Sequence, residues 1–288
     1  MSDHRILVTA ANGQLGRLTI DALLKIVPAG QIVAGMRDPV KGRDLAAKGV
    51  TVVAADYTKP ETLDAAVKGI DRLLLISSNE LGQRIAQHRN VIDAAKKAGV
   101  KLIAYTSVLR ADTSKLSVAK EHLPTEALIR ASGIPFALLR NGWYTENYTA
   151  SIPAALAHNA LVSSAKDGRI ASASREDYAA AAATVLAGGD HAGKVYELAG
   201  DEAFTLDDFA AEISKQSGKA IPYVRLPEAE FKAIMLNAGL PEELAELIAT
   251  SNTAAADGAL FDDGHTLSKL IGRKTTPFAT TIAEALKA

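Results

Sequence analysis

Short apolar runs alternate with longer segments of helical periodicity through the first half of the chain. Several runs, such as residues 73–76, are apolar without interruption, which is typical of strands covered by helices on both faces. The alternation predicts an α/β fold built on a Rossmann-type, doubly wound parallel sheet. The predicted strands are residues 5–9, 31–36, 51–55, 72–76, 101–106 and 135–140.

The segments between these runs carry apolar residues at helical spacing. Leu15, Leu18, Leu23 and Ile26 lie on one face of a helix that follows the first strand, so this face can pack on the sheet. Residues 80–98 predict a second helix, which Gly99 would end.

The pattern changes after Arg140. Short apolar pieces at residues 195–198 and 221–224 are separated by predicted helices, and the alanine-rich residues 179–183 predict the start of a buried helix. The expected division is one domain over residues 1–150, to which later segments return, and a smaller C-terminal α/β lobe over residues 151–288.

Composition excludes several classes of function. The 288 residues contain 32 Lys plus Arg against 33 Asp plus Glu, so there is no positive surplus to bind nucleic acid. The absence of cysteine excludes disulfides, zinc–thiolate sites, iron–sulfur clusters and a cysteine nucleophile. The apolar stretch at residues 6–8 is far shorter than the roughly 18 residues of a membrane span, and we expect a soluble, cytoplasmic protein without a membrane partner.

A glycine-containing turn joins the first predicted strand to the first predicted helix. In dinucleotide-binding folds three glycines allow a tight turn, close approach of the pyrophosphate and close helix packing, and the helix N-terminus attracts the phosphates. Gly13 and Gly16 hold the second and third positions, whereas Ala10 replaces the first. An ordinary strand-to-helix turn is the alternative, but the flanking strand and helix favour a dinucleotide site.

Arg37 lies at the end of the second predicted strand, about 20 residues after Gly16, where NAD-binding chains place an acid and NADP-binding chains an arginine. It therefore predicts NADP, with residues 1–150 as the NADP-binding domain and residues 151–288 as the substrate-binding lobe. The alternative is a solvated surface arginine paired with Asp38.

Several segments together resemble the NmrA-like atypical short-chain dehydrogenases. They span essentially the whole chain, and the sequence Arg-Asn-Gly-Trp-Tyr from Arg140 to Tyr144 and the late tail are the most specific. The segments are residues 9–16, 73–80, 136–148, 258–263 and 266–272.

The resemblance implies an NADPH-dependent oxidoreductase that reduces a quinone, and it implies where NADPH would bind. Ala10, where the family usually has glycine, would begin the turn around the pyrophosphate, Arg37 would bind the 2′-phosphate, and Asp56 would lie near the adenine. The remaining residues implied to contact the cofactor are Ala11, Asn12, Gly13, Gln14 and Leu15 at the pyrophosphate, Ser77, Ser78 and Asn79 at the ribose, and Asn141, Gly142, Trp143, Tyr144, Thr145 and Glu146 beneath the nicotinamide.

The usual Tyr-x-x-x-Lys pair of short-chain dehydrogenases is missing from the helix expected after the fifth strand. His122 and Glu126 have the same spacing and would share one helix face. A quinone suits this absence because it accepts a hydride without a strong acid. His122 could still protonate the product, or could simply be packed. We expect Tyr144 and Asn147 in the substrate pocket, with loop packing as the alternative.

Other readings stay open. A redox-sensing regulator could bind NADP without turnover, and a dye, an enone or an imine could replace the quinone as acceptor. A homodimer is a further expectation. Trp143 is either a buried anchor or a stacking surface, and Ser107 either contacts the cofactor or begins a loop. Asp262, Asp263 and His265 could suggest a metal, but carboxylates before a helix are commonly N-caps, so we expect no metal.

Overall fold

The computed structural model describes residues 4–287, which group into two compact units. The first unit comprises the chain up to Ala111, with Glu121–Asn141 and Arg175–Tyr196. The second comprises Asp112–Lys120, Gly142–Ser174 and the chain from Glu197 onward. Both units are therefore discontinuous in sequence. The expected boundary between two domains at residue 150 stays a prediction.

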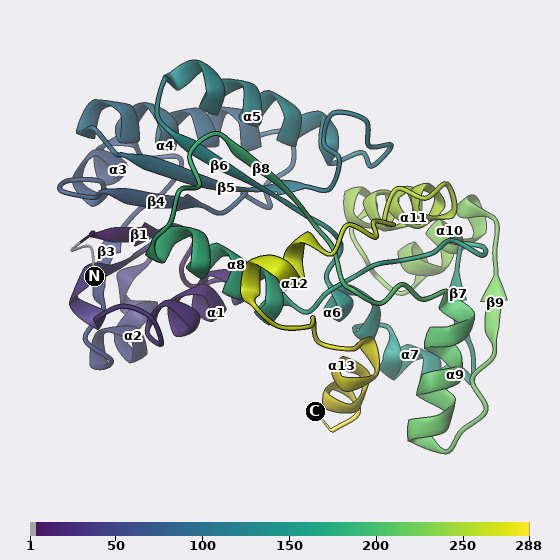
Figure 1. Ribbon diagram of the computed structural model, residues 1–288. Coiled ribbons are helices and arrows are strands. Elements are labelled where there is room, and N and C mark those ends of the chain that lie inside the picture. Colours follow the sequence, from purple (N-terminus) through teal and green to yellow (C-terminus); the bar gives the residue numbers. More distant parts are fainter. Residues whose placement is uncertain (1–3, 288) are drawn as a thin grey trace. The chain divides into compact units, whose positions relative to one another are not determined.

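The first unit is built on a sheet in the order β3-β2-β1-β4-β5-β6-β8 (Figure 1). Neighbouring strands from β3 to β6 pair in parallel, and Leu7 of β1 lies opposite Val33 on one side and Leu73 on the other. The six strands predicted in this half are confirmed to within about two residues at each end. The strands are β1 (Ile6–Val8), β2 (Ile32–Met36), β3 (Thr51–Ala54), β4 (Arg72–Leu75), β5 (Leu102–Val108), β6 (Phe136–Asn141) and β8 (Lys194–Leu198).

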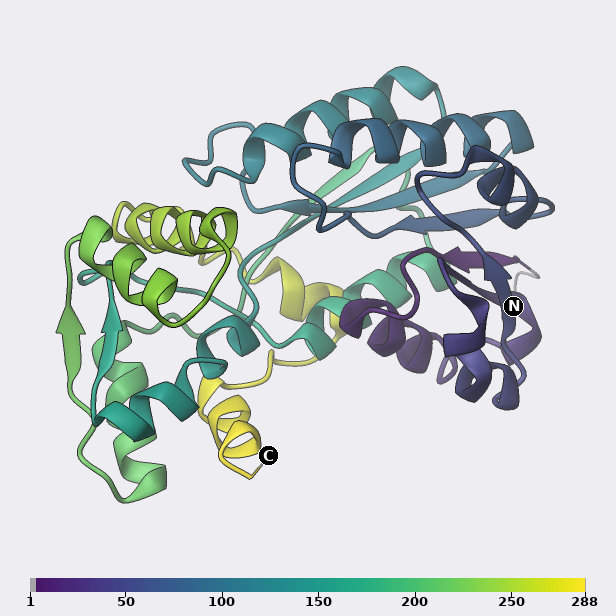
Figure 2. The same cartoon turned by 180° about the vertical axis from the view of Figure 1, so that it is seen from behind.

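Helices cover both faces of this sheet, as the doubly wound fold requires (Figures 1 and 2). One face carries α1 (Gln14–Leu23), α2 (Arg43–Ala47) and α8 (Arg175–Ala187), and the other carries α3 (Pro60–Ala66), α4 (Arg84–Ala98) and α5 (Ala119–Ser132). The strands between them are apolar on both sides, and all seven residues of β5 are buried.

Three details of the predicted helices are wrong. The first helix ends at Leu23, so Ile26 lies beyond it and is exposed. The second begins at Arg84 rather than at residue 80, although Gly99 ends it in the left-handed conformation as predicted. The alanine-rich residues 179–183 lie in the middle of α8, which begins at Arg175.

The second unit contains a small parallel sheet of β7 (Leu161–Ser163) and β9 (Tyr223–Arg225), surrounded by helices. Rings of Tyr148, Phe204, Phe209 and Phe278 pack together in its core. The predicted apolar pieces correspond to β8 and β9, whereas the short strand β7 was not predicted. The helices are α6 (Thr145–Thr149), α7 (Ile152–His158), α9 (Leu206–Ser217), α10 (Glu228–Asn237), α11 (Glu242–Ala256), α12 (Thr266–Ile271) and α13 (Phe278–Ala285).

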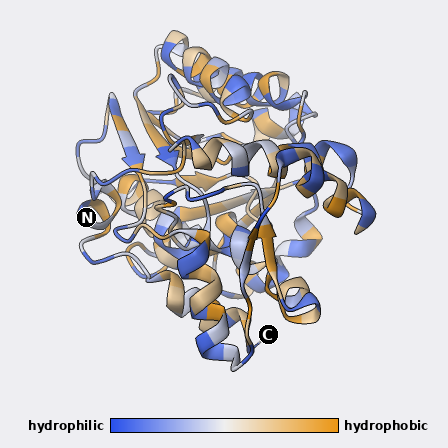
Figure 3. Cartoon of the chain, turned by 90° about the vertical axis from the view of Figure 1, so that its right-hand side faces the viewer, coloured by the Kyte–Doolittle hydropathy of each residue, from blue (hydrophilic) through white to orange (hydrophobic). Residues whose placement is uncertain are grey.

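Hydrophobic and hydrophilic residues are mixed along most helices (Figure 3), as expected where one face packs on a core and the other meets water. Between residues 4 and 287, none of the helices combines the length and the apolar character that crossing a bilayer requires.

Candidate functional site

In the sheet of the first unit, the order in which successive strands are added reverses at β1. The chain proceeds from β1 to β2 and β3 on one side, then returns to β4 on the other. Ligands of open α/β sheets bind outside the carboxyl ends of the strands at such a reversal. The turn after β1, the start of the loop after β2 and the loop after β4 all meet this edge, so these segments form the candidate site.

The turn after β1 has the geometry of a phosphate-binding turn. Ala10 adopts a left-handed conformation with φ of 48°, which explains why related patterns place glycine there. A Cβ on Gly16 would lie 2.6 Å from the Ala10 carbonyl oxygen and 2.8 Å from Ala11 Cα. Gly16 therefore permits the close packing of α1 on the turn, which is the role predicted for the third glycine.

Helix α1 begins at this turn with donors suited to an anion. Its N-cap is Gly13, no side chain among residues 4–287 caps it, and its first turn contains no acidic residue. Asn12, Gly13 and Gln14 are exposed, whereas Ala11 and Leu15 are buried. The first N–H groups of the helix thus lie at the surface with the positive end of its dipole.

Two residues to which the sequence analysis gave no role bond to the end of β4: Thr9, at the end of β1, and Tyr57, after β3. Thr9 Oγ1 donates to the Leu74 carbonyl oxygen (2.8 Å) and accepts from the Ile76 N–H (3.2 Å). The Tyr57 hydroxyl donates to the Ile76 carbonyl oxygen (2.8 Å), and burial raises its pKa. These bonds fix the two strand ends beyond their regular pairing.

Asp56, expected near the adenine, is half-buried and locally bonded. Its Oδ1 accepts from the N–H of Thr58 (2.9 Å) and from the Thr58 hydroxyl (2.8 Å). The carboxylate therefore closes a turn after β3.

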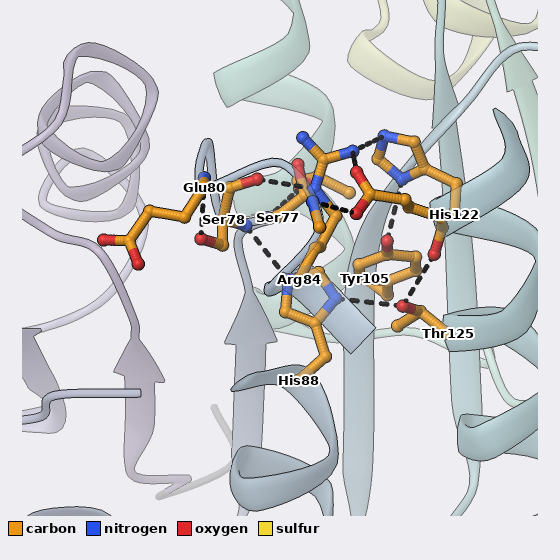
Figure 4. Close-up of polar contacts among 11 residues, drawn as sticks. Ser77, Ser78, Glu80, Arg84, His88, Tyr105, His122 and Thr125 are labelled. Carbon is orange, nitrogen blue, oxygen red and sulfur yellow. Dashed lines mark hydrogen bonds and ion pairs between the residues drawn. The ribbon is translucent and has the colours of Figure 1, made fainter. Parts of the chain in front are cut away.

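Helix α4 holds the loop after β4 (Figure 4). The Ser78 N–H donates to His88 Nε2 (2.9 Å), and Arg84 Nε donates to the Ser78 carbonyl oxygen (2.6 Å). The Ser77 N–H donates to Thr106 Oγ1 (2.8 Å), while Asn79 is exposed. Side chains of α4 and β5 thus hold the backbone of this loop in place. Polar residues at positions 84, 87 and 88 share one face of α4, and that spacing was the available sequence signal.

The same contacts define the protonation of two buried histidines. Because a backbone N–H can only donate, His88 Nε2 accepts and His88 Nδ1 donates to Thr125 Oγ1 (3.0 Å). Because Arg84 can only donate, His122 Nε2 accepts from its Nη1 (3.4 Å) and His122 Nδ1 donates to the Tyr105 hydroxyl (2.7 Å). Both rings therefore carry their proton on Nδ1.

Burial and the nearby Arg84 charge lower the pKa of His88 to about 3. The same two causes, in the same order, lower the pKa of His122 well below its usual value. His122 is buried, neutral at pH 7 and bonded at both ring nitrogens. Its catalytic role stays a prediction, and this environment favours the alternative of a packed residue.

We expect the free energy of unfolding to fall as the pH drops below about 6.5, because the unfolded chain binds a proton at His88 that the folded protein excludes. The slope is about 1.4 kcal/mol per pH unit for this histidine, until the pH approaches the folded pKa of about 3. Urea unfolding of the wild type and His88→Gln at pH 7 and pH 5 measures it. The variant should lose about 2 kcal/mol less than the wild type between these pH values.

His158→Gln is the matched control, since His158 is exposed at the end of α7. It should lose as much stability as the wild type. Equal losses in all three proteins would contradict the buried, neutral state of His88.

His122 and Glu126 lie on one buried face of α5, as their spacing predicted. Glu126, only 1% exposed, accepts from Arg140 Nε at Oε1 (2.9 Å) and from Arg140 Nη2 at Oε2 (2.8 Å). Ser107 lies within β5 rather than after it, and its hydroxyl donates to Glu126 Oε1 (2.6 Å). Both carboxylate oxygens of Glu126 therefore accept hydrogen bonds, and its buried ion pair with Arg140 joins α5 to β6.

Asn141 ends β6 with a buried polar atom. Its Oδ1 accepts no hydrogen bond from any residue between 4 and 287. A buried acceptor without a donor is costly unless a ligand supplies one.

The segment that continues from β6 belongs to the second unit. Tyr144 is the N-cap of α6, and its backbone pairs with that of Ala173 in an isolated parallel β-bridge. Thr145 is buried, with its hydroxyl 2.8 Å from that of Ser172. Of the remaining predicted site residues here, Gly142 is buried, Trp143 and Glu146 are half-buried, and Asn147 is exposed.

Arg37 follows β2 and its side chain is 67% exposed. Its Nη1 lies 3.0 Å from Glu80 Oε1. The alternative pairing with Asp38 is wrong: Arg37 pairs with Glu80, and Asp38 Oδ1 accepts from the Val40 N–H (3.1 Å).

The predicted carboxylate cap near residue 262 is also wrong. The N-cap of α12 is His265, with φ of 52°, and Asp262 instead accepts from the Gly264 N–H (2.9 Å). His265 Nδ1 lies 3.0 Å from Asp201 Oδ1. Within the described chain, no group of three or more His, Asp or Glu residues is placed to hold a metal ion.

Comparison with known proteins gives matches over nearly the full length. Residues 2–285 match the model of the NmrA-like family. Quinone oxidoreductase 2 of Escherichia coli (strain K12) is 56% identical over 278 residues, 96% of this chain and 97% of that protein. The crystal structure of the E. coli NADPH-dependent quinone oxidoreductase with NADPH has a TM-score of 0.96 at 56% identity, covering 98% of this chain and 99% of that one. Citrobacter sp. triphenylmethane reductase with NADP(H) has a TM-score of 0.93 at 40% identity, covering 97% and 99%.

Proposed function

The chain belongs to the NmrA-like family, and on that premise we propose that it is an NADPH-dependent oxidoreductase that reduces a quinone. The observation that carries the proposal is the full-length similarity to E. coli quinone oxidoreductase 2, whose structure contains NADPH. The switch-point geometry of the first unit supports the same conclusion, because it provides the edge at which a dinucleotide binds.

The residues at this edge fit NADPH. The exposed N-terminus of α1 offers N–H groups without a competing acid, and Gly16 lets the helix pack against the turn. The orphaned Oδ1 of Asn141 offers an acceptor to a carboxamide N–H. The residues proposed to hold the cofactor are Ala10 to Leu15 at the pyrophosphate, Arg37 at the 2′-phosphate, Asp56 at the adenine, Ser77 to Asn79 at the ribose, and Asn141 to Glu146 at the nicotinamide.

When bound, NADPH supplies a hydride from its nicotinamide ring. The chain binds and orients both partners, and His122 is neutral at pH 7, with its single ring proton donated to the Tyr105 hydroxyl, so it is no imidazolium acid for the product. Tyr144 and Asn147 follow the end of β6 directly in the chain, and we assign them to positioning the acceptor. A quinone needs alignment more than it needs an acid, so no acidic side chain is assigned to the hydride transfer, and the proton that completes the hydroquinone comes from solvent.

The direct test is the loss of NADPH absorbance when a small benzoquinone is added to the purified protein. Quinone-dependent oxidation of NADPH is the expected result. Tight NADPH binding without oxidation would contradict the proposal and favour the redox-sensing regulator. A triphenylmethane dye is the second acceptor to assay, because the Citrobacter reductase is similar over the full chain. The cytoplasmic location and the homodimer stay predictions.

Arg37→Ala should weaken NADPH binding by about 1.5–3 kcal/mol, the range for hydrogen bonds to charged groups, and leave NADH binding nearly unchanged. The reason is that only NADPH carries the 2′-phosphate. Fluorescence titration with both nucleotides measures the effect. Arg89→Ala, which removes an exposed positive charge from α4, should change neither affinity. An equal loss for NADPH and NADH in Arg37→Ala would reject the assignment.

A further inference from the structure

An ion pair joins two of the loops at the switch point. Arg37 follows β2, and Glu80 lies in the loop after β4, with Arg37 Nη1 3.0 Å from Glu80 Oε1. Because β1 lies between β2 and β4, the pair connects the loops on either side of the phosphate-binding turn. Arg37 is also the residue proposed to bind the 2′-phosphate.

Glu80 is the better fixed of the two partners. The buried Gln87 of α4 donates from Nε2 to Glu80 Oε2 (2.5 Å), and the Glu80 N–H donates to Ser78 Oγ (3.2 Å). The carboxylate points away from the Arg84–His122 contacts (Figure 4). Arg37 has a long, mostly exposed side chain, so it is the partner that can exchange one anion for another.

We infer that Glu80 competes with the 2′-phosphate for Arg37 and so limits the preference for NADPH over NADH. The inference rests on the proposed function. A carboxylate and a phosphate use the same guanidinium donors, so Arg37 must leave Glu80 to bind the phosphate fully. The fixed Glu80 charge also repels the phosphate dianion. NADH has no charge at that position, and its binding leaves the ion pair intact.

The test is Glu80→Gln, which keeps the shape of the side chain and an acceptor for Gln87. The Kd for NADPH should fall about three- to tenfold, because an exposed ion pair and a nearby like charge are removed, whereas the Kd for NADH should not change. Asp64→Asn is the matched control. It removes an exposed carboxylate that pairs with Lys97 in the same manner, and it should alter neither Kd.

The double variant Glu80→Gln/Arg37→Ala identifies the cause. Without Arg37 most of the gain in NADPH affinity should disappear. In the single variant Glu80→Gln, the gain in NADPH affinity should shrink at high salt. Equal changes for both nucleotides, weaker NADPH binding, or the same gain in Asp64→Asn would each overturn the inference. A wild-type protein that binds NADPH tightly but gains nothing from Glu80→Gln overturns this inference alone. A wild type that binds no NADPH overturns the proposed function with it.

Discussion

Replacing Gly13 with valine should abolish detectable NADPH binding while the protein stays folded. Gly13 has φ of −74° and ψ of 164°, an extended conformation that valine adopts readily. A Cβ at this position lies 3.3 Å from the Ala10 carbonyl oxygen, so the turn needs to move only slightly. The branched side chain would fill the space beside the first N–H groups of α1. We expect a loss of about 3 kcal/mol or more, from overpacking and lost hydrogen bonds together.

Fluorescence titration with NADPH and thermal unfolding together test this prediction. Gly16→Val is the contrasting variant, since its Cβ would meet backbone atoms at 2.6 Å and should lower Tm as well. Ala10→Gly should bind NADPH as tightly as the wild type or more tightly, because glycine adopts the left-handed conformation without strain. Normal NADPH affinity in a folded Gly13→Val protein would reject the phosphate-binding turn.

The second large effect concerns the residues after β6. Replacing Tyr144 or Asn147 with alanine should lower the rate of quinone reduction by on the order of a hundredfold, since a positioning error of about 1 Å costs that much. His122→Ala should keep most of the rate, because His122 is buried and neutral near pH 7 and its one ring proton is donated to the Tyr105 hydroxyl. Steady-state kinetics with NADPH and a benzoquinone compare the three variants.

Each rate is to be divided by the fraction of folded protein, because His122→Ala removes buried hydrogen bonds and should lower Tm. A large fall in kcat for His122→Ala, with near-normal Tyr144 and Asn147 variants, would make His122 the proton donor. Equal falls in all three variants would leave no distinct role for Tyr144 and Asn147 in orienting the acceptor.

The features predicted correctly depend on residues that are close in sequence. Strand positions follow from apolar runs, the end of α4 follows from Gly99, and the turn after β1 follows from Gly13 and Gly16. Each is encoded within a few consecutive residues, because periodicity and backbone conformation are local properties. The full-length family resemblance then added the expected reaction.

What only the tertiary structure decided is which polar side chains meet. Arg37 pairs with Glu80 rather than with its neighbour Asp38, and Glu126 is neutralised by Arg140 from the next strand. His88 supports Ser78 across a loop, and that contact sets the tautomer of a histidine that the sequence did not single out. Such pairings depend on how strands and helices are placed in space, and burial then lowers the pKa of His88. The sequence by itself therefore determined the sheet, the turn and the candidate cofactor, whereas the packing of strands and helices decided which charged side chains pair with one another.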